Sequence, residues 1–131
     1  MTFKTLIIDG NNVHDISSFY DEINRVFMAG EDWKIGPSLD ALDDMLYGGF
    51  GALKGDEAVI LTWKAIEKSR DDLGLDATRS YYLKKLEQPS NFDVGRIRQH
   101  LAELESGIGP TYFEIVLQII ADHANIELRS A

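Results

Sequence analysis

Three short apolar runs, each separated from the next by helical sequence, constrain the fold of this 131-residue chain more than any other feature. The runs cover residues 3–9, 58–62 and 125–130. Parallel strands need a long crossover connection, usually a helix, so strands joined in this way are expected to pair in parallel with right-handed crossovers. The pattern predicts an α/β fold with a small, parallel, three-stranded sheet flanked by helices.

Helical sequence fills the connections between these runs. Ser17 or Ser18 can cap the first helix, because Ser18 and Asp21 have capping-box spacing. The segment 75–91 is expected to be a loop or a short helix, followed by a break at Pro89-Ser90-Asn91. Further helices are expected between Ser38 and Gly48 and over 64–73, 94–105 and 111–123. The last of these is apolar on nearly every side, which predicts packing from several directions.

The short helix that follows Ser38 carries an acidic face. Asp40 and Asp44 are four residues apart, Asp43 lies beside them, and no lysine or arginine in the segment balances them. Like charges at this spacing repel by roughly 0.2–0.5 kcal/mol per pair, so stability alone does not explain the face. The opposite side carries leucines at helical spacing, which predicts that the carboxylates face solvent or a partner. The residues of that apolar side are Leu39, Leu42 and Leu46.

Charge and composition limit the class of partner. The net charge of -9 argues against a nucleic-acid backbone and favours a basic protein. Residues 21–44 hold seven acids and two bases, whereas residues 64–98 hold six acids and eight bases, so the acidity gathers around the short helix. The chain has no cysteine, which excludes disulfides, thiolate catalysis and cysteine-ligated metals. Without a signal-peptide pattern or an apolar run of membrane length, we expect a cytoplasmic monomer that needs no cofactor or metal and contacts no membrane.

Several motifs resemble the barstar family, the intracellular protein inhibitors of secreted bacterial ribonucleases. The most specific are the Leu-Asp-Ala-Leu-x-Asp helix over 39–44 and the Trp-x-x-x-Glu-x-Ser junction from Trp63 to Ser69. The strand and turn over 8–13 and the segment 116–119 add weaker support. The resemblance implies a barstar-like single domain over residues 1–131, with an inserted helical segment at about 75–109.

The resemblance also implies a mechanism in which the acidic helix fills the phosphate-binding cleft of a basic, barnase-like ribonuclease. Asp44 would be the main phosphate mimic and Asp40 the second. Ser38 and Leu39 would flank them, Gly48 would allow close backbone approach, and Asp122 would correspond to an acidic residue late in the last helix. Two positions depart from the family pattern, since Lys34 and Asp43 stand where interface aromatics are usual.

Two other functions remain open from the sequence. The opening Leu-Ile-Ile-Asp-Gly-Asn-Asn-Val is similar to that of PIN- and NYN-type nucleases, where an aspartate such as Asp9 helps to bind a divalent metal. Their chemistry needs several carboxylates at neighbouring strand ends, and the other two strands end near Lys64 and Arg129. The third possibility is an acidic interaction module with no nuclease target. We therefore expect an inhibitor and not an enzyme.

Overall fold

Three parallel strands form one sheet in the order β1-β2-β3 in the computed structural model, which describes residues 3–88 and 90–131. Leu6 of the first strand lies opposite Leu61 of the second, and Leu61 lies opposite Leu128 of the third. The predicted α/β class and the parallel sheet are therefore confirmed. The strands are β1 (Lys4–Asp9), β2 (Val59–Lys64) and β3 (Ile126–Ser130).

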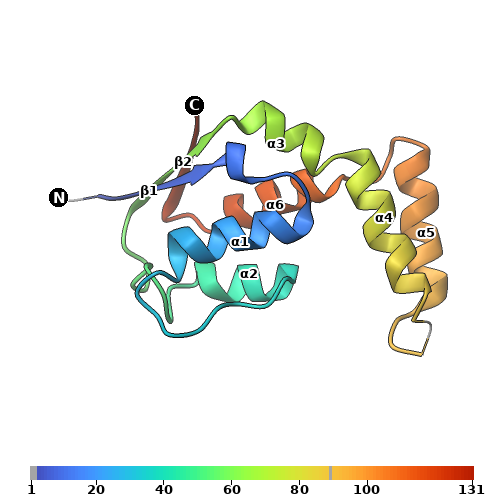
Figure 1. Cartoon of the computed structure of the whole chain (residues 1–131), viewed down its shortest axis with the longest axis horizontal. Coiled ribbons are helices and arrows are strands. Elements are labelled where there is room, and N and C mark those ends of the chain that lie inside the picture. Colours follow the sequence, from blue (N-terminus) through green and yellow to red (C-terminus); the bar gives the residue numbers. More distant parts are fainter. Residues whose placement is uncertain (1–2, 89) are drawn as a thin grey trace.

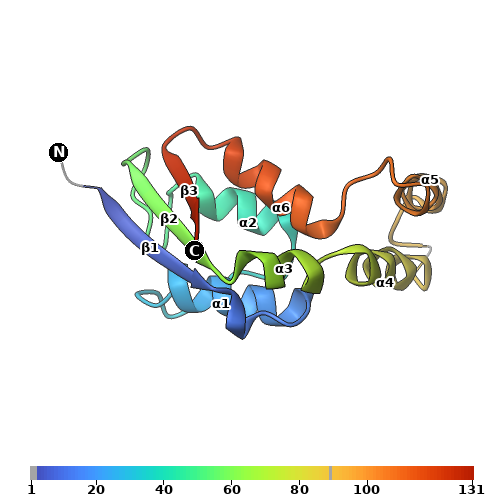
Figure 2. The ribbon, with the colours of Figure 1, turned by 90° about the horizontal axis from the view of Figure 1, so that it is seen from above.

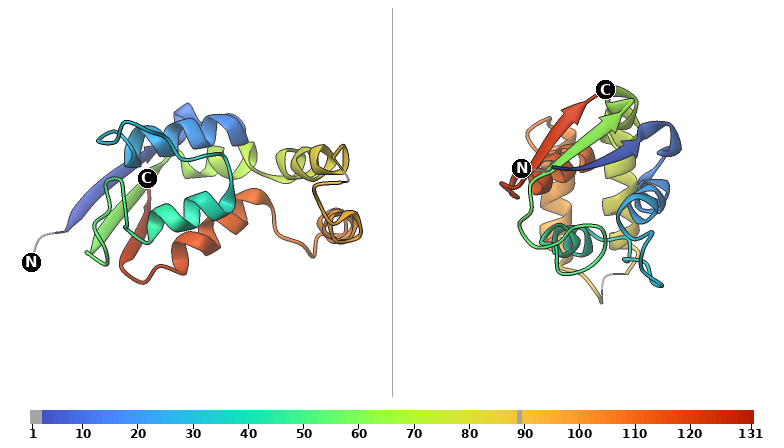
Figure 3. Two further views of the ribbon diagram at one scale, coloured as in Figure 1. Left: turned by 90° about the horizontal axis from the view of Figure 1, so that it is seen from below. Right: turned by 90° about the vertical axis from the view of Figure 1, so that its left-hand side faces the viewer.

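Helices cover one face of the sheet and leave the other open to solvent (Figure 1, Figure 2). Along β2, Val59, Leu61 and Trp63 are buried and alternate with partly exposed neighbours, as expected for a half-covered strand. α1 (Ile16–Phe27) packs on β1 and α6 (Tyr112–Ala121) packs on β3. α2 (Leu39–Leu46) lies against α6 on the side away from the sheet (Figure 3).

An aromatic cluster joins the sheet to its helices. The fully buried Trp63 ring stacks on Phe19 at 5.8 Å and meets the edge of Phe113 at 5.5 Å. The hydroxyls of Tyr20 and Tyr112, also buried, lie 2.6 Å apart. Burial raises the pKa of Tyr20 to about 12, so this hydroxyl stays protonated and can share a hydrogen bond at neutral pH.

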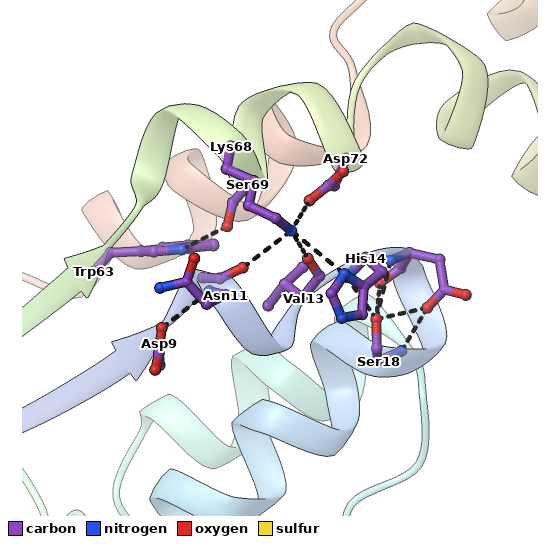
Figure 4. A network of polar contacts seen from close by, with 11 residues as sticks. Asp9, Asn11, Val13, His14, Ser18, Trp63, Lys68, Ser69 and Asp72 are labelled. Atoms are coloured by element: carbon purple, nitrogen blue, oxygen red, sulfur yellow. Dashed lines mark hydrogen bonds and ion pairs between the residues drawn. The ribbon is translucent and has the colours of Figure 1, made fainter.

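The turn after β1 is locked to α3 (Ile66–Asp72) by polar contacts (Figure 4). Lys68 Nζ donates to the carbonyl of Val13 at 2.6 Å and pairs with Asp72 at 2.6 Å. Ser69 Oγ accepts the Trp63 indole N–H at 2.9 Å. The turn itself is the short 3-10 helix η1 (Gly10–Asn12), in which Gly10 cannot carry a side chain, because a Cβ would collide with backbone oxygens of the junction. The Trp63–Ser69 motif is thus a structural junction.

The expected cap of the first helix is wrong. Asp15, not Ser17 or Ser18, is the N-cap of α1, and Ser18 is the third helical residue of an Asp15–Ser18 capping box. The helix therefore starts earlier than the serine pattern indicates. The segment 75–91, for which a loop or a short helix was expected, contains a regular helix, α4 (Leu75–Leu86). Thr78 Oγ1 accepts the Tyr112 N–H at 2.7 Å, and this hydrogen bond joins α4 to α6. Pro89, part of the expected break, lies outside the described residues.

The predicted inserted segment forms a helical hairpin that extends beyond the rest of the molecule (Figure 1, Figure 3). It consists of α4 and α5 (Val94–Glu105), which pack on each other. A small separate core of Tyr82, Ile97 and Leu104 holds them together. Where the hairpin joins the main body, the Phe113 N–H donates to the Leu73 carbonyl at 3.0 Å, so its two ends meet. The hairpin itself covers neither face of the sheet.

Candidate functional site

The sequence around α2 sets both ends of the helix and its inner face. Ser38 is the N-cap, as predicted, and its Oγ accepts the Ala41 N–H at 3.1 Å. The helix ends at Leu46 with Tyr47 as its C-cap, after which Gly48 takes a left-handed φ of 85° that favours glycine. Leu39 is partly buried against the core. The fully buried side chains of the inner face are Leu42, Met45 and Leu46.

Asp40 and Asp44 are exposed on the outer face of α2. Neither side chain makes a hydrogen bond or ion pair with another residue of the ranges 3–88 and 90–131. Asp40 lies in the first turn, where the helix dipole favours a carboxylate. Asp44 lies close to the C-terminal end, where the dipole opposes it, and the last turn has no basic residue. This carboxylate therefore costs stability and receives no internal compensation.

Asp43 has a different environment from its two neighbours. Its Oδ1 lies 2.7 Å from Nε2 of His123, and the His123 side chain is only 5% exposed. The same imidazole meets the Tyr47 ring edge-on at 4.6 Å. The expectation that all three carboxylates face solvent or a partner is therefore wrong for Asp43. The reason is a contact between residues 80 positions apart, which no local pattern could reveal.

The contacts of His123 also bring Asp122 to the acidic helix. Asp122 is the exposed C-cap of α6, and its Oδ1 accepts a hydrogen bond from Gln118 at 3.0 Å. Because His123 contacts Asp43 and Tyr47, this end of α6 lies beside the C-terminal half of α2 (Figure 2). The internal partner of Asp122 among the described residues is thus an amide and not a cation.

Gly48 is buried, and its backbone lies close to another segment of the same chain. A Cβ at this position would collide with the backbone of Gly55, whose N–H donates to the Gly48 carbonyl at 2.9 Å. The glycine thus fixes the loop that follows α2. A contact between Gly48 and a partner remains a prediction.

Exposed aromatic side chains flank α2, and reasoning from sequence missed them. Tyr47 is 68% exposed at the end of the helix, and Trp33 is 45% exposed before it. The Trp33 ring packs on Phe50 with 4.8 Å between ring centres. Large aromatic side chains beside unpaired charges are typical of protein-binding surfaces. In the sequence, Tyr47 directly precedes Gly48-Gly49, and Trp33 lies in the loop between Gly30 and Gly36.

Asp9 has the geometry of a turn residue. Its side chain accepts the Asn11 N–H at 2.9 Å and caps η1 (Figure 4). Lys64 lies opposite it on β2, so the neighbouring strand end contributes a cation. The nearby Glu22 carboxylate accepts hydrogen bonds from the Asp9 N–H at 2.7 Å and from Arg25 at 2.6 and 2.7 Å. Within the described ranges, no three His, Cys, Asp or Glu side chains are grouped to hold a metal.

The fold, the acidic helix and the strand-to-helix junction can now be compared with known proteins. None of the described helices has the length and apolar character to cross a membrane. A search of curated proteins finds no match. A family model described as Barstar (barnase inhibitor) matches residues 3–89, which include α2 and the Trp63–Ser69 junction. That match spans more than half of the 131 residues, and the chain belongs to the barstar family.

Proposed function

We propose that this chain is a stoichiometric inhibitor of a basic, barnase-like ribonuclease, made in the cytoplasm to protect the cell that produces the enzyme. One observation carries the proposal beyond family membership. Asp40 and Asp44 are exposed on one face of α2 without internal partners in the described ranges, while Leu42, Met45 and Leu46 on the other face are buried. The helix therefore presents two carboxylates on a support that does not need to rearrange before binding.

In the proposed mechanism, the two carboxylates take the place of RNA phosphates in the enzyme's cleft. Lysine, arginine and histidine side chains that bind phosphate form charge-assisted hydrogen bonds to carboxylates equally well. Asp44 and Asp40 make these bonds, and Ser38, Leu39, Gly48 and Asp122 form the surrounding contacts. Asp43 supports the site indirectly, because its contact with His123 holds that imidazole against the helix. RNA is then excluded because its site is filled.

The proposal is tested with the double substitution Asp40→Ala and Asp44→Ala. Truncating buried charged contacts at an interface costs about 2–4 kcal/mol, so affinity for a barnase-like ribonuclease should fall by about 30-fold or more. The matched control is Glu67→Ala with Asp71→Ala, an acidic pair at the same spacing on the exposed side of α3. Calorimetric titration should give a stoichiometry of one for the wild type and the control. Equal affinity of both double variants would refute the interface.

Stability measurements on the single variant Asp44→Ala provide an independent readout. Removing a carboxylate that opposes the helix dipole should raise the free energy of unfolding by about 0.5 kcal/mol, as measured in urea. A variant that is more stable and binds less tightly shows that the carboxylate serves binding. Lower stability together with unchanged binding would assign Asp44 to the fold.

The two alternative functions predict different results. A metal-dependent nuclease would cleave RNA in the presence of magnesium or manganese, and Asp9→Asn would abolish that cleavage. An acidic module with no nuclease target would bind no ribonuclease and would recover another basic protein from a lysate. Inhibition of ribonuclease cleavage of a fluorogenic RNA, saturating at one inhibitor per enzyme, excludes both.

A further inference from the structure

A groove of about 390 Å³ lies between the α4–α5 hairpin and the main body. Its walls come from Tyr81, Tyr82 and Lys85 of α4 and from Arg96 and His100 of α5. The family match ends at residue 89, so the α5 wall lies outside the matched region. The groove is therefore partly built from sequence that the family model does not describe.

The groove is cationic and aromatic within an acidic protein. Lys85 Nζ lies 4.3 Å from the centre of the Tyr81 ring and 5.3 Å from that of Phe92. His100 stacks on Tyr82 at 5.6 Å with the rings 10° apart. Among the described residues, no carboxylate forms an ion pair with Lys85 or with the other groove cation, Arg96.

Among the described residues that line the groove, the one acidic side chain, Asp93, forms no ion pair with these cations. Asp93 is the N-cap of α5, and its carboxylate accepts the backbone N–H of Arg96 at 3.1 Å. The positive charge at the groove is therefore available to an external anion, with apolar ring surface beside it. This combination fits a carboxylate next to an aromatic or aliphatic side chain.

The groove reaches the N-terminal end of α2. Leu39 and Ile115 of α6 both line it, and Leu39 immediately precedes Asp40. A protein seated on Asp40 and Asp44 would therefore have its edge next to the groove. Figure 2 shows the hairpin extending past the end of the helical layer.

We propose, resting on the proposed function, that the groove binds an acidic, aromatic or aliphatic segment at the edge of the same ribonuclease whose cleft receives α2. The acidic helix α2 binds the basic cleft, which related ribonucleases share. The cationic groove binds an acidic segment outside that cleft. Two contacts of opposite polarity favour one orientation of the enzyme and disfavour ribonucleases that carry basic residues at that edge.

The test reverses charge in the groove with Lys85→Glu and Arg96→Glu. Its control is Lys84→Glu with Arg98→Glu, which makes the same charge change on the same two helices at exposed positions outside the groove. Binding of the ribonuclease that the wild type inhibits should weaken about tenfold or more in the groove variant and less than about twofold in the control. Equal affinities in the two variants would overturn the groove contact while leaving the proposed function intact.

A second measurement does not depend on any nuclease. A fluorescent acidic copolymer of glutamate and tyrosine should bind the wild type and the control variant but not the groove variant. Equal binding by groove and control variants would overturn the groove proposal. If the wild type binds a labelled oligouridylate more tightly than the copolymer and the groove variant loses that binding, the groove is assigned to RNA and the proposal is overturned. If the wild type inhibits no ribonuclease, the proposed function fails, and the copolymer result decides separately whether the groove binds acidic segments.

Discussion

Three aspartates lie within five positions of α2, yet their environments differ. Asp40 and Asp44 could be placed on the outer face by helical spacing alone, and the structure finds both exposed. Asp43 could not be assigned, because its partner His123 lies just after the end of α6, 80 residues later. Local periodicity predicts which face a residue lies on. Contacts between distant segments decide whether its charge is free.

The Asp43–His123 contact should contribute to stability more than to binding. We expect Asp43→Ala and His123→Ala each to lower the free energy of unfolding, with a coupling energy of about 1 kcal/mol in a double-mutant cycle. Urea denaturation of the two single variants and the double variant measures this coupling. Strictly additive losses would mean that the contact contributes nothing to stability.

Gly48 and Gly49 form a natural pair for testing backbone strain. Gly48→Ala should lower the free energy of unfolding by about 2 kcal/mol or more, because φ is 85° and the new Cβ meets the Gly55 backbone. Gly49→Ala, where a Cβ meets nothing within 4 Å, should change it by less than about 0.5 kcal/mol. Equal effects in thermal unfolding would show that the loop rearranges around either side chain.

At the scale of elements, the buried Glu22 links β1, η1 and α1. Its carboxylate accepts hydrogen bonds from the Asp9 backbone, from Asn12 Nδ2 and from Arg25. Burial by itself raises the pKa of Glu22, but the hydrogen bonds from Arg25, Asp9 and Asn12 outweigh burial and leave the pKa below its ordinary value of 4.5. The ionised carboxylate is thus the form that the fold requires.

This arrangement predicts a loss of stability in acid. A lowered pKa means that the contribution of Glu22 is complete above its unfolded-state pKa and disappears as pH falls through the folded-state value. Glu22→Gln should cost about 1–3 kcal/mol at neutral pH, and the difference from wild type should shrink below about pH 4. Urea titrations across pH measure the difference, with the exposed Glu87→Gln as control. A difference that stays constant with pH would contradict the assignment.

The elements that were predicted well from the sequence are those with a clear hydrophobic period or a clear capping residue. α5 was expected over 94–105 and spans those residues, and Ser38 was identified as the cap of α2. α4 was uncertain because its polar residues are spread around the helix, and its first turn is secured by the contact between Thr78 and Tyr112. Asp15 was overlooked because the adjacent serines offered equally good caps.

For the whole molecule, charge should control how fast a basic partner arrives. The net charge of -9 and its concentration over residues 21–44 create a field that salt screens. The association rate constant with a basic ribonuclease should fall several-fold between about 0.05 M and about 0.5 M salt, while dissociation changes little. Stopped-flow fluorescence measures both rates. An association rate independent of salt would argue against electrostatic steering.

Strand order, the open face of the sheet and the position of the hairpin were beyond prediction from a single sequence. Each of these features depends on how distant elements pack. The apolar runs that predict the strands do not show whether helices cover one face of the sheet or both faces. The exposed aromatics Tyr47 and Trp33 were missed for the same reason, since an aromatic side chain normally predicts burial.

The meeting of the hairpin's two ends at Leu73 and Phe113 has a consequence for how the molecule opens. Because the entry and exit points are already joined by a hydrogen bond, α4 and α5 can separate from each other without disturbing the strand pairing. Their amide protons should exchange with solvent through partial unfolding of lower free energy, while those of β2 exchange only when the whole molecule unfolds. We therefore expect the chain to unfold as two cooperative units, and a ligand held between hairpin and body would merge them into one.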